Sequence, residues 1–161
     1  MQISGPRTII DFEGGAMAYM DILAGSPGWT MSSEYSYAGS MSMTNVVDDE
    51  SWGTRSDLVL KVDLANPSTI TLQARIDVGQ GYETFALFVD GQQRNTYGQR
   101  ITGKNDEPIW LPVTTSLSPG RHVLKMSVLK APSRPENWPR DYGPEGSGGV
   151  WVDEIEIFDT Q

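Results

Sequence analysis

The chain has a single histidine, His122, and its place in the sequence argues against a catalytic role. General acid–base or nucleophilic catalysis needs a titratable group beside an orienting neighbour. His122 instead alternates with the apolar residues of its segment, Leu124, Met126 and Val128. A period of two places the imidazole on the core side of a β-strand. We therefore expect a hydrogen-bonded, partly buried histidine.

The other parts of common catalytic sites are missing or uninformative. The sequence contains no cysteine, which excludes a disulfide framework, a zinc–thiolate cluster and a thiol nucleophile. Glycoside hydrolysis needs two carboxylates across a groove, but a chain with 21 acidic residues contains such pairs by chance. We predict that the protein is not an enzyme.

Aromatic residues in loops point to binding instead. Protein sites for sugars pair an exposed aromatic ring with a few polar groups, because sugars present apolar ring faces and rows of hydroxyls. The predicted ligand-binding residues are Trp52, Tyr97, Trp138, Arg140 and Tyr142. The alternative is that such aromatic residues close the ends of the fold, as we expect for those in strand-like segments, Trp29, Trp110 and Trp151.

The acidic composition of the chain disfavours two classes of binding partner. The formal net charge is −9, which disfavours nucleic acid, because phosphate binding needs a surface of lysine and arginine. The same balance disfavours an anionic membrane surface. No stretch approaches the roughly 20 apolar residues that a membrane span needs, and the first eleven residues lack the pattern of a secretory signal. We expect synthesis in the cytoplasm.

Alternation of apolar and polar residues predicts β-strands through most of the chain. The runs 58–64 and 70–78 are the cleanest, and we expect them to pair as a long antiparallel hairpin. Segment 84–90 is apolar on both faces, which predicts a central strand, and Asp90-Gly91 then predicts a tight turn into a return strand over 92–99. Other strands are predicted at 8–12, 29–32, 40–44, 109–117, 121–130 and 150–158.

These elements predict an all-β fold. Eight to ten strands with regular turns in one chain of 161 residues indicate an antiparallel β-sandwich of the jelly-roll type, folded as a single domain over 1–161. Pro108 and Pro112 place the strand over 109–117 at a sheet edge. Segment 16–23 is open to two interpretations, a short helix or an irregular loop. The segment 131–149 is a long loop rich in proline and glycine, which is typical of functional or disordered segments.

Three short motifs in a fixed order carry a family resemblance. They are Asp11-Phe12-Glu13-Gly14, the turn and strand SPGRHVL over 118–124, and the last strand VWVDEIEI over 150–157. The chain resembles the carbohydrate-binding-module jelly rolls of the galactose-binding-like superfamily, where an N-terminal acidic pair and an aspartate–X–isoleucine last strand bracket the fold. MAM-like and laminin-G-like adhesion domains show a similar order, and FVDG over 88–91 fits them as well.

The resemblance implies a structural calcium ion where the first and last strands meet. The residues that match its ligands in order are Asp11, Glu13, Asp153 and Glu154. Calcium takes six to eight hard oxygen ligands, which adjacent terminal strands can supply. The alternative is that these carboxylates face solvent. A second acidic group, DDE over 48–50, lacks the spacing of a calcium-binding loop, and we expect it to be solvated.

Two classes of function remain, and both are non-catalytic. The first is a bacteriophage virion surface protein, for decoration or adhesion, whose partners are other protein subunits and whose jelly roll also binds polysaccharide. The second is a glycan-binding module of a bacterial cell-surface or polysaccharide-degrading system, with an extracellular location. A free-standing domain without cysteine or export signal favours the virion, but fold analogy alone does not decide function.

Overall fold

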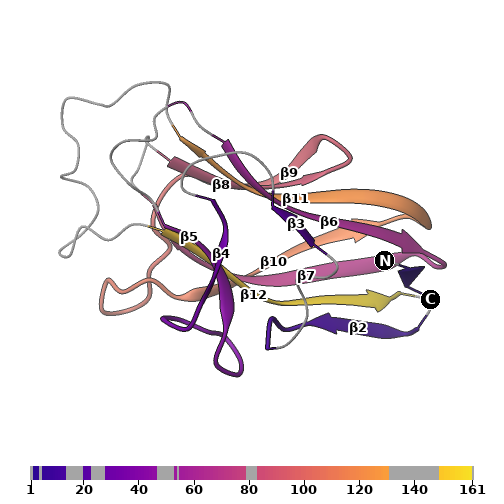
Figure 1. Cartoon of the computed structure of the whole chain (residues 1–161), viewed down its shortest axis with the longest axis horizontal. Coiled ribbons are helices and arrows are strands. Elements are labelled where there is room, and N and C mark those ends of the chain that lie inside the picture. Colours follow the sequence, from indigo (N-terminus) through magenta and orange to yellow (C-terminus); the bar gives the residue numbers. More distant parts are fainter. Residues whose placement is uncertain are drawn as a thin grey trace.

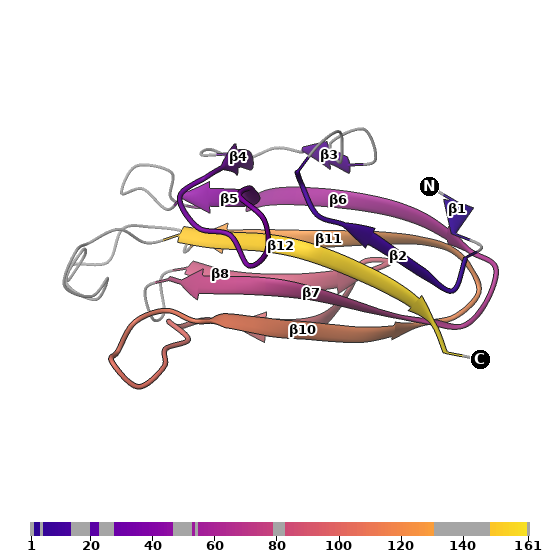
Figure 2. The same cartoon turned by 90° about the horizontal axis from the view of Figure 1, so that it is seen from below.

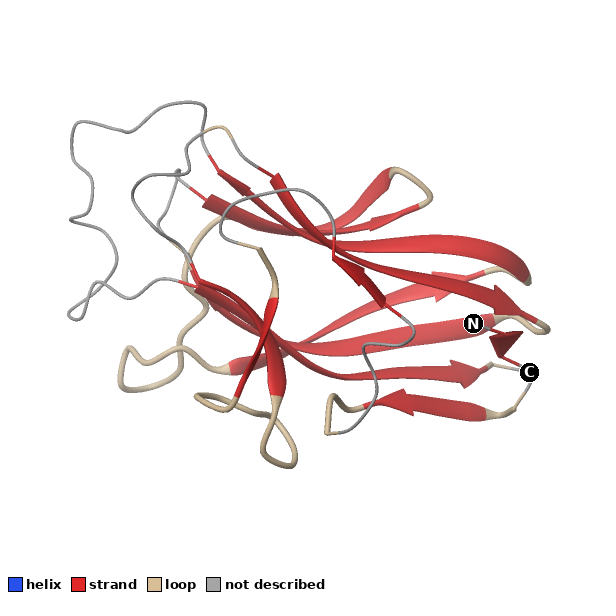
Figure 3. Ribbon diagram, in the orientation of Figure 1, coloured by secondary structure: helices blue, strands red, loops and turns tan. Residues whose placement is uncertain are grey.

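A computed structural model of the chain describes residues 2–3, 5–13, 20–22, 28–46, 53, 55–78, 83–130 and 149–160. These residues form twelve β-strands and no helix (Figure 3). The described part accordingly contains no helix that is long and apolar enough to cross a membrane. The strands pack as two facing sheets, which confirms the predicted β-sandwich of the jelly-roll type (Figure 1).

The first sheet is built around the long strand β6 (Arg55–Leu64). Its strand order is β1 (Gln2–Ile3), β6, β11 (Gly120–Lys130), β8 (Glu83–Val89) and β9 (Gln92–Tyr97), with β3 (Met20–Ile22) also pairing with β6. Only the short β1 runs parallel to its neighbour among these described strands. Strand β8 lies between β11 and β9, so the central place predicted for 84–90 is confirmed.

The second sheet is built around β7 (Ser68–Asp77) and β12 (Gly149–Asp159). Its strand order is β10 (Trp110–Leu117), β7, β12, β5 (Ser42–Val46) and β4 (Thr30–Ser32), and β2 (Arg7–Ile10) pairs with the C-terminal half of β12. Figure 2 looks onto this sheet. Strand β10 forms one edge, as its prolines predicted.

The core lies between the two sheets and follows the period of two. In β7 the residues Ile70, Leu72, Ala74 and Ile76 are buried, while the alternate residues face outward. Trp29 is also buried, and its indole Nε1 donates a hydrogen bond to the backbone oxygen of Ser56 at 3.2 Å. Each fully buried aliphatic side chain contributes roughly 1.5–3 kcal/mol to folding. The alternating pattern in the sequence therefore specifies which face of each strand is outward.

The predicted hairpin is wrong, and neither interpretation left open for segment 16–23 fits residues 20–22, which form a strand. The runs 58–64 and 70–78 do not form a hairpin, because β6 and β7 belong to different sheets. Both strands bury one apolar face in the same core, and the chain crosses from one sheet to the other at 65–67. A helix over 16–23 is excluded for Met20–Ile22, which pairs as β3 with β6, and residues 16–19 and 23 lie outside the described part. The structure also has more strands than the eight to ten predicted. The additional strands, β1 and β3, are only two and three residues long, too short for an alternating pattern to reveal them.

Candidate functional site

A row of large side chains crosses the outer face of the second sheet. Arg75 of β7 lies opposite Trp110 of β10 on one side and opposite Trp151 of β12 on the other. Directly opposed residues in antiparallel strands point to the same face, about 5 Å apart at their Cβ atoms. The register therefore places an arginine between two tryptophans on one surface of the sheet.

The loop between β4 and β5 adds two tyrosines to this row. The guanidinium of Arg75 lies over the ring of Tyr35 at 3.6 Å and over the ring of Trp151 at 4.9 Å. Tyr35 and Trp151 meet edge to face with centroids 4.9 Å apart, and Tyr37 meets Trp110 in the same way at 6.0 Å. Cation–π contacts are favourable by roughly 0.5–2 kcal/mol. We call these five residues, Tyr35, Tyr37, Arg75, Trp110 and Trp151, the Arg75 cluster.

The cluster has a buried base and an exposed rim. Trp151 is only 2% exposed, whereas Tyr37 is 49% exposed and Trp110 is partly exposed. Polar groups continue along the same face, where the hydroxyls of Thr71 and Thr114 lie 3.0 Å apart. Exposed aromatic rings beside hydroxyl and amide groups are the chemistry that recognises a sugar ring.

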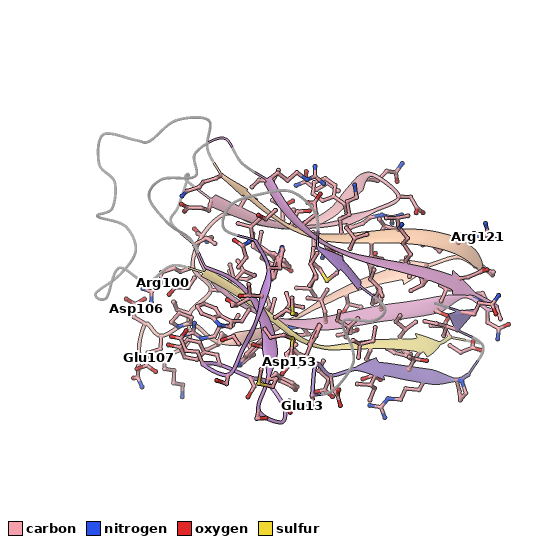
Figure 4. The ribbon with its side chains drawn as sticks, in the orientation of Figure 1. Glu13, Arg100, Asp106, Glu107, Arg121 and Asp153 are labelled. Carbon is pink, nitrogen blue, oxygen red and sulfur yellow. The ribbon has the colours of Figure 1, made fainter. Side chains whose placement is uncertain are left out.

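Two carboxylates hold the loop that carries the tyrosines. Asp153 Oδ2 accepts hydrogen bonds from the backbone N–H groups of Tyr37 at 2.8 Å and Ala38 at 3.1 Å. Glu13 Oε1 accepts from the N–H groups of Ser40 at 2.7 Å and Met41 at 2.9 Å. Figure 4 shows both carboxylates at this loop. One loop is therefore fixed by four charge-assisted hydrogen bonds, which are stronger than neutral ones.

The electrostatics of the two carboxylates differ. Burial raises the pKa of Asp153, the backbone N–H groups of Ala38, Tyr37 and Glu154 lower it, and the negative charge of Glu13 adds to the rise. The N–H groups of Met41 and Ser40 lower the pKa of Glu13, which is exposed. Asp153 is 0% exposed, so its charge depends on the donors of the loop.

Gly39 permits the close approach of the loop to Glu13. Its φ is +66°, and a Cβ there would lie 2.5 Å from Cδ of Glu13, well inside van der Waals contact. We expect Gly39→Ala to lower the free energy of unfolding by about 1–3 kcal/mol, from backbone strain and from displacement of Glu13. Gly91→Ala is the matched control, because Gly91 has φ +80° but open space around it. Urea unfolding of both variants measures the difference, and equal losses would contradict the clash.

The predicted calcium residues are only partly brought together. Glu13 and Asp153 meet at one loop, where their oxygens accept N–H donors. Asp11 accepts the N–H of Glu13 at 3.2 Å, and Glu154, with φ 46°, stands at the register shift of β12. Within the described part of the chain, no three histidine, cysteine, aspartate or glutamate side chains group so as to hold a metal ion. Calcium stays a prediction.

The predicted ligand residues do not form a described site. Tyr97 ends β9 half-buried, stacked on Phe85 with centroids 6.4 Å apart and packed against the core. The other four, Trp52, Trp138, Arg140 and Tyr142, lie outside the described residues, as do the acidic run 48–50 and the loop segment 131–148. Their roles stay predictions. The aromatic surface that the structure describes beside the second sheet is the Arg75 cluster. From the sequence we expected its two tryptophans, Trp110 and Trp151, to close the ends of the fold, and its two tyrosines were not singled out.

The side chain of His122 connects two turns, at Asp90 and at Ser118, and we call these contacts the His122 clasp. Its Nδ1 lies 2.6 Å from Asp90 Oδ2, and its Nε2 lies 2.8 Å from the backbone oxygen of Ser118. Asp90 also accepts the N–H of Val123 at 2.8 Å. Both ring nitrogens face acceptors, and only the imidazolium can donate from both. Burial lowers the pKa of His122, but the hydrogen bonds to Asp90 and to the Ser118 carbonyl outweigh burial and raise the pKa overall.

Because of the His122 clasp, we expect the stability of the folded protein to depend on pH. The pKa of His122 is higher in the folded than in the unfolded protein. Its contribution to the free energy of unfolding is therefore complete below the unfolded pKa, near 6.5, and is lost as the pH rises through the folded pKa. The pKa of Asp90 is lowered by the Val123 N–H and by His122, so its contribution is lost in acid. We expect His122→Gln to be less stable than the wild type at about pH 5 and closer to it at about pH 8. A constant difference in thermal melts would contradict the clasp.

The protein is similar to known proteins in its fold and not in its sequence. No protein-family model matches the sequence, and no curated protein matches it. Solved structures do match. The K1 cleaved adhesin domain of Lys-gingipain from Porphyromonas gingivalis has 14% identity and a TM-score of 0.60, covering 98% of this chain and 100% of that one. A family 35 carbohydrate-binding module from Clostridium thermocellum has 13% identity and a TM-score of 0.51, covering 97% and 100%.

The fold is that of the carbohydrate-binding-module jelly rolls. A family 35 module of Cellvibrio japonicus Abf62 agrees, with 13% identity, a TM-score of 0.52, and coverage of 96% of this chain and 94% of that one. The resemblance inferred from the three motifs is thus confirmed as a likeness of fold, with the adhesin domain as the adhesion-like match. Identities this low carry the fold and leave function to the site.

Proposed function

We propose that this protein is a non-catalytic glycan-binding module and that the outer face of its second sheet holds the ligand. The observation that carries the proposal is the Arg75 cluster, in which Tyr37 presents an exposed ring and Trp110 a partly exposed ring on the outer face of the sheet. Its structural neighbours, carbohydrate-binding modules and an adhesin domain, support the same class of function. They also support a location at the cell surface or outside the cell.

The arrangement suits binding without reaction. Rings held by Arg75 and a loop held by two carboxylates keep the same shape with and without ligand, which lowers the entropy lost on binding. Glu13 and Asp153, the acidic groups beside the cluster, accept backbone hydrogen bonds and are already engaged. Neither is placed as a free acid or base for a bond-breaking step.

A glycan array followed by a test for product decides this proposal. We expect specific binding to at least one class of polysaccharide, with no release of shorter sugars on prolonged incubation. A chain that binds nothing on a broad array, or that cleaves its ligand, would overturn the proposal.

We also propose a calcium ion where the first and last strands meet, with Asp11, Glu13, Asp153 and Glu154 as its candidate ligands, of which Glu13 and Asp153 lie at the loop. Both are hard oxygen ligands, and Glu13 Oε2 and Asp153 Oδ1 each accept one hydrogen bond, which leaves a lone pair for a cation. Burial raises the pKa of Asp153, and the negative charge of Glu13 adds to the rise. A cation beside them would relieve this repulsion. We expect calcium to raise the melting temperature, because an ion that binds only the folded state stabilises it. Unchanged melting after chelation, with and without added calcium, would exclude the ion.

We also propose, more specifically, that the protein lies on the surface of a bacteriophage virion and associates there with other protein subunits. A virion surface protein would assemble with copies of itself or with capsid or tail proteins. Sedimentation of the purified chain tests self-association, and neighbouring genes for capsid or tail proteins would support the location. A neighbouring glycosidase gene would favour the polysaccharide-degrading alternative.

A further inference from the structure

The Arg75 cluster contains a guanidinium that forms no ion pair with a described carboxylate, although its charge acts at longer range on Asp77. Among the described residues, ion pairs engage Arg7, Arg55, Arg100 and Arg121 with carboxylates, and none engages Arg75. Asp77, two residues further along β7, is paired with Arg100 at 2.6 Å. Asp153, opposite the neighbouring Gln73, is held by the N–H groups of the loop. The guanidinium of Arg75 is instead partnered by two aromatic faces.

Stacking leaves the hydrogen-bonding edge of a guanidinium available. The five N–H donors of arginine lie in the plane of the group, so rings above its plane hold the side chain without using those donors. No described acceptor is hydrogen-bonded to Arg75, and the adjacent Trp151 Nε1 is buried without an acceptor as well. Arg75 is only partly buried, so its edge can meet a ligand. Planar guanidinium groups pair with carboxylate and sulfate oxygens in a bidentate manner.

We propose that the ligand is an anionic glycan, whose carboxylate or sulfate group binds Arg75 while a sugar ring lies on Trp110 and Tyr37. This inference rests on the proposed function and names its substrate class. The cross-strand register places Arg75 next to Trp110, and Tyr37 contacts the same tryptophan. The charged group and the stacking rings are thus neighbours on one face, within the span of one or two sugar units.

Matched ligands that differ only in charge test this. We would measure binding of oligogalacturonate against its methyl ester, and of a sulfated galactan oligosaccharide against its desulfated form, by isothermal titration. The wild type is expected to bind at least one charged ligand about tenfold or more tightly than its neutral counterpart, because a charge-assisted contact is lost in the neutral form. The arm that shows this preference distinguishes carboxylate from sulfate.

Variants then assign the preference to Arg75. Arg75→Gln should remove the difference in affinity between charged and neutral ligands. Arg75→Lys should retain only part of this difference, because lysine lacks the planar guanidinium that binds in a bidentate manner. Arg121→Gln is the control, since Arg121 is 91% exposed and belongs to the other sheet. Its preference should equal that of the wild type.

The outcomes separate the two proposals. If the wild type binds charged and neutral forms equally, or binds only neutral glycans on an array, the anionic class is wrong and the glycan-binding function stands. If no glycan binds at all, the function fails with it. Because the first comparison uses the wild type alone, a variant that fails to fold does not prevent the test.

Discussion

Asp153→Ala is expected to lower the free energy of unfolding by roughly 2–4 kcal/mol. The carboxylate is fully buried and accepts three backbone hydrogen bonds, from Tyr37, Ala38 and Glu154. Alanine leaves these three donors without their acceptor and leaves a void beneath the loop. The loop that carries Tyr35 and Tyr37 would lose its attachment to β12, so ligand binding should weaken together with stability.

Urea unfolding, monitored by tryptophan fluorescence, measures the loss. Asp63→Ala is the matched control, because Asp63 is an aspartate at the surface whose partner, Arg121, lies 3.8 Å away. Exposed pairs of this kind contribute about 0–1 kcal/mol. If the two variants unfold at the same urea concentration, the proposed attachment of the loop by Asp153 is wrong.

Trp110→Ala is expected to weaken glycan binding by about thirtyfold, since a central aromatic anchor contributes on the order of 2 kcal/mol. Trp110 stands at the edge of the sheet beside Arg75 and supports Tyr37. Its removal takes away one stacking surface and the neighbour of the second. Trp110→Phe keeps a ring face and should lose much less affinity.

Phe88→Ala controls for the loss of an aromatic side chain in general. Phe88 lies on the outer face of the first sheet, where the guanidinium of Arg55 is 4.5 Å from its ring. It reproduces an arginine–aromatic stack far from the proposed site. Affinity that falls in Phe88→Ala and stays constant in Trp110→Ala, measured by titration with the best ligand on the array, would place the site on the other sheet.

The fold was predictable because its information is local. Alternating residues in β7 and the Asp90-Gly91 turn each specify a strand or a hairpin within about ten residues of chain. The pairing of β6 was not predictable in the same way. Its apolar face fits the core from either sheet, so its neighbour is decided by the crossing at 65–67 and by β11, which is distant in sequence.

The candidate site was missed for a related reason. Arg75, Trp110 and Trp151 come from three separate segments, and only the pairing of β10, β7 and β12 brings them together. Trp110 and Trp151 stand in strands, which suggested burial in the core, yet both occupy the outward phase of their strands. Trp151 is nevertheless buried, in contact with Tyr35 and Arg75 on the outer face. The phase was the available signal: Trp110 alternates with Val113 and Leu117 on the opposite face. The contribution of the loop could be read only from its contacts with Asp153 and Glu13.

The position of the bound glycan on the folded chain shows whether the outer face of the second sheet is the binding surface. We would titrate isotope-labelled protein with the best glycan from the array and follow each backbone amide by nuclear magnetic resonance. We predict that the largest shifts cluster on residues around Arg75 in β7, Trp110 in β10 and Tyr37 in the loop. Shifts confined to the first sheet, or to residues far from this cluster, would contradict it.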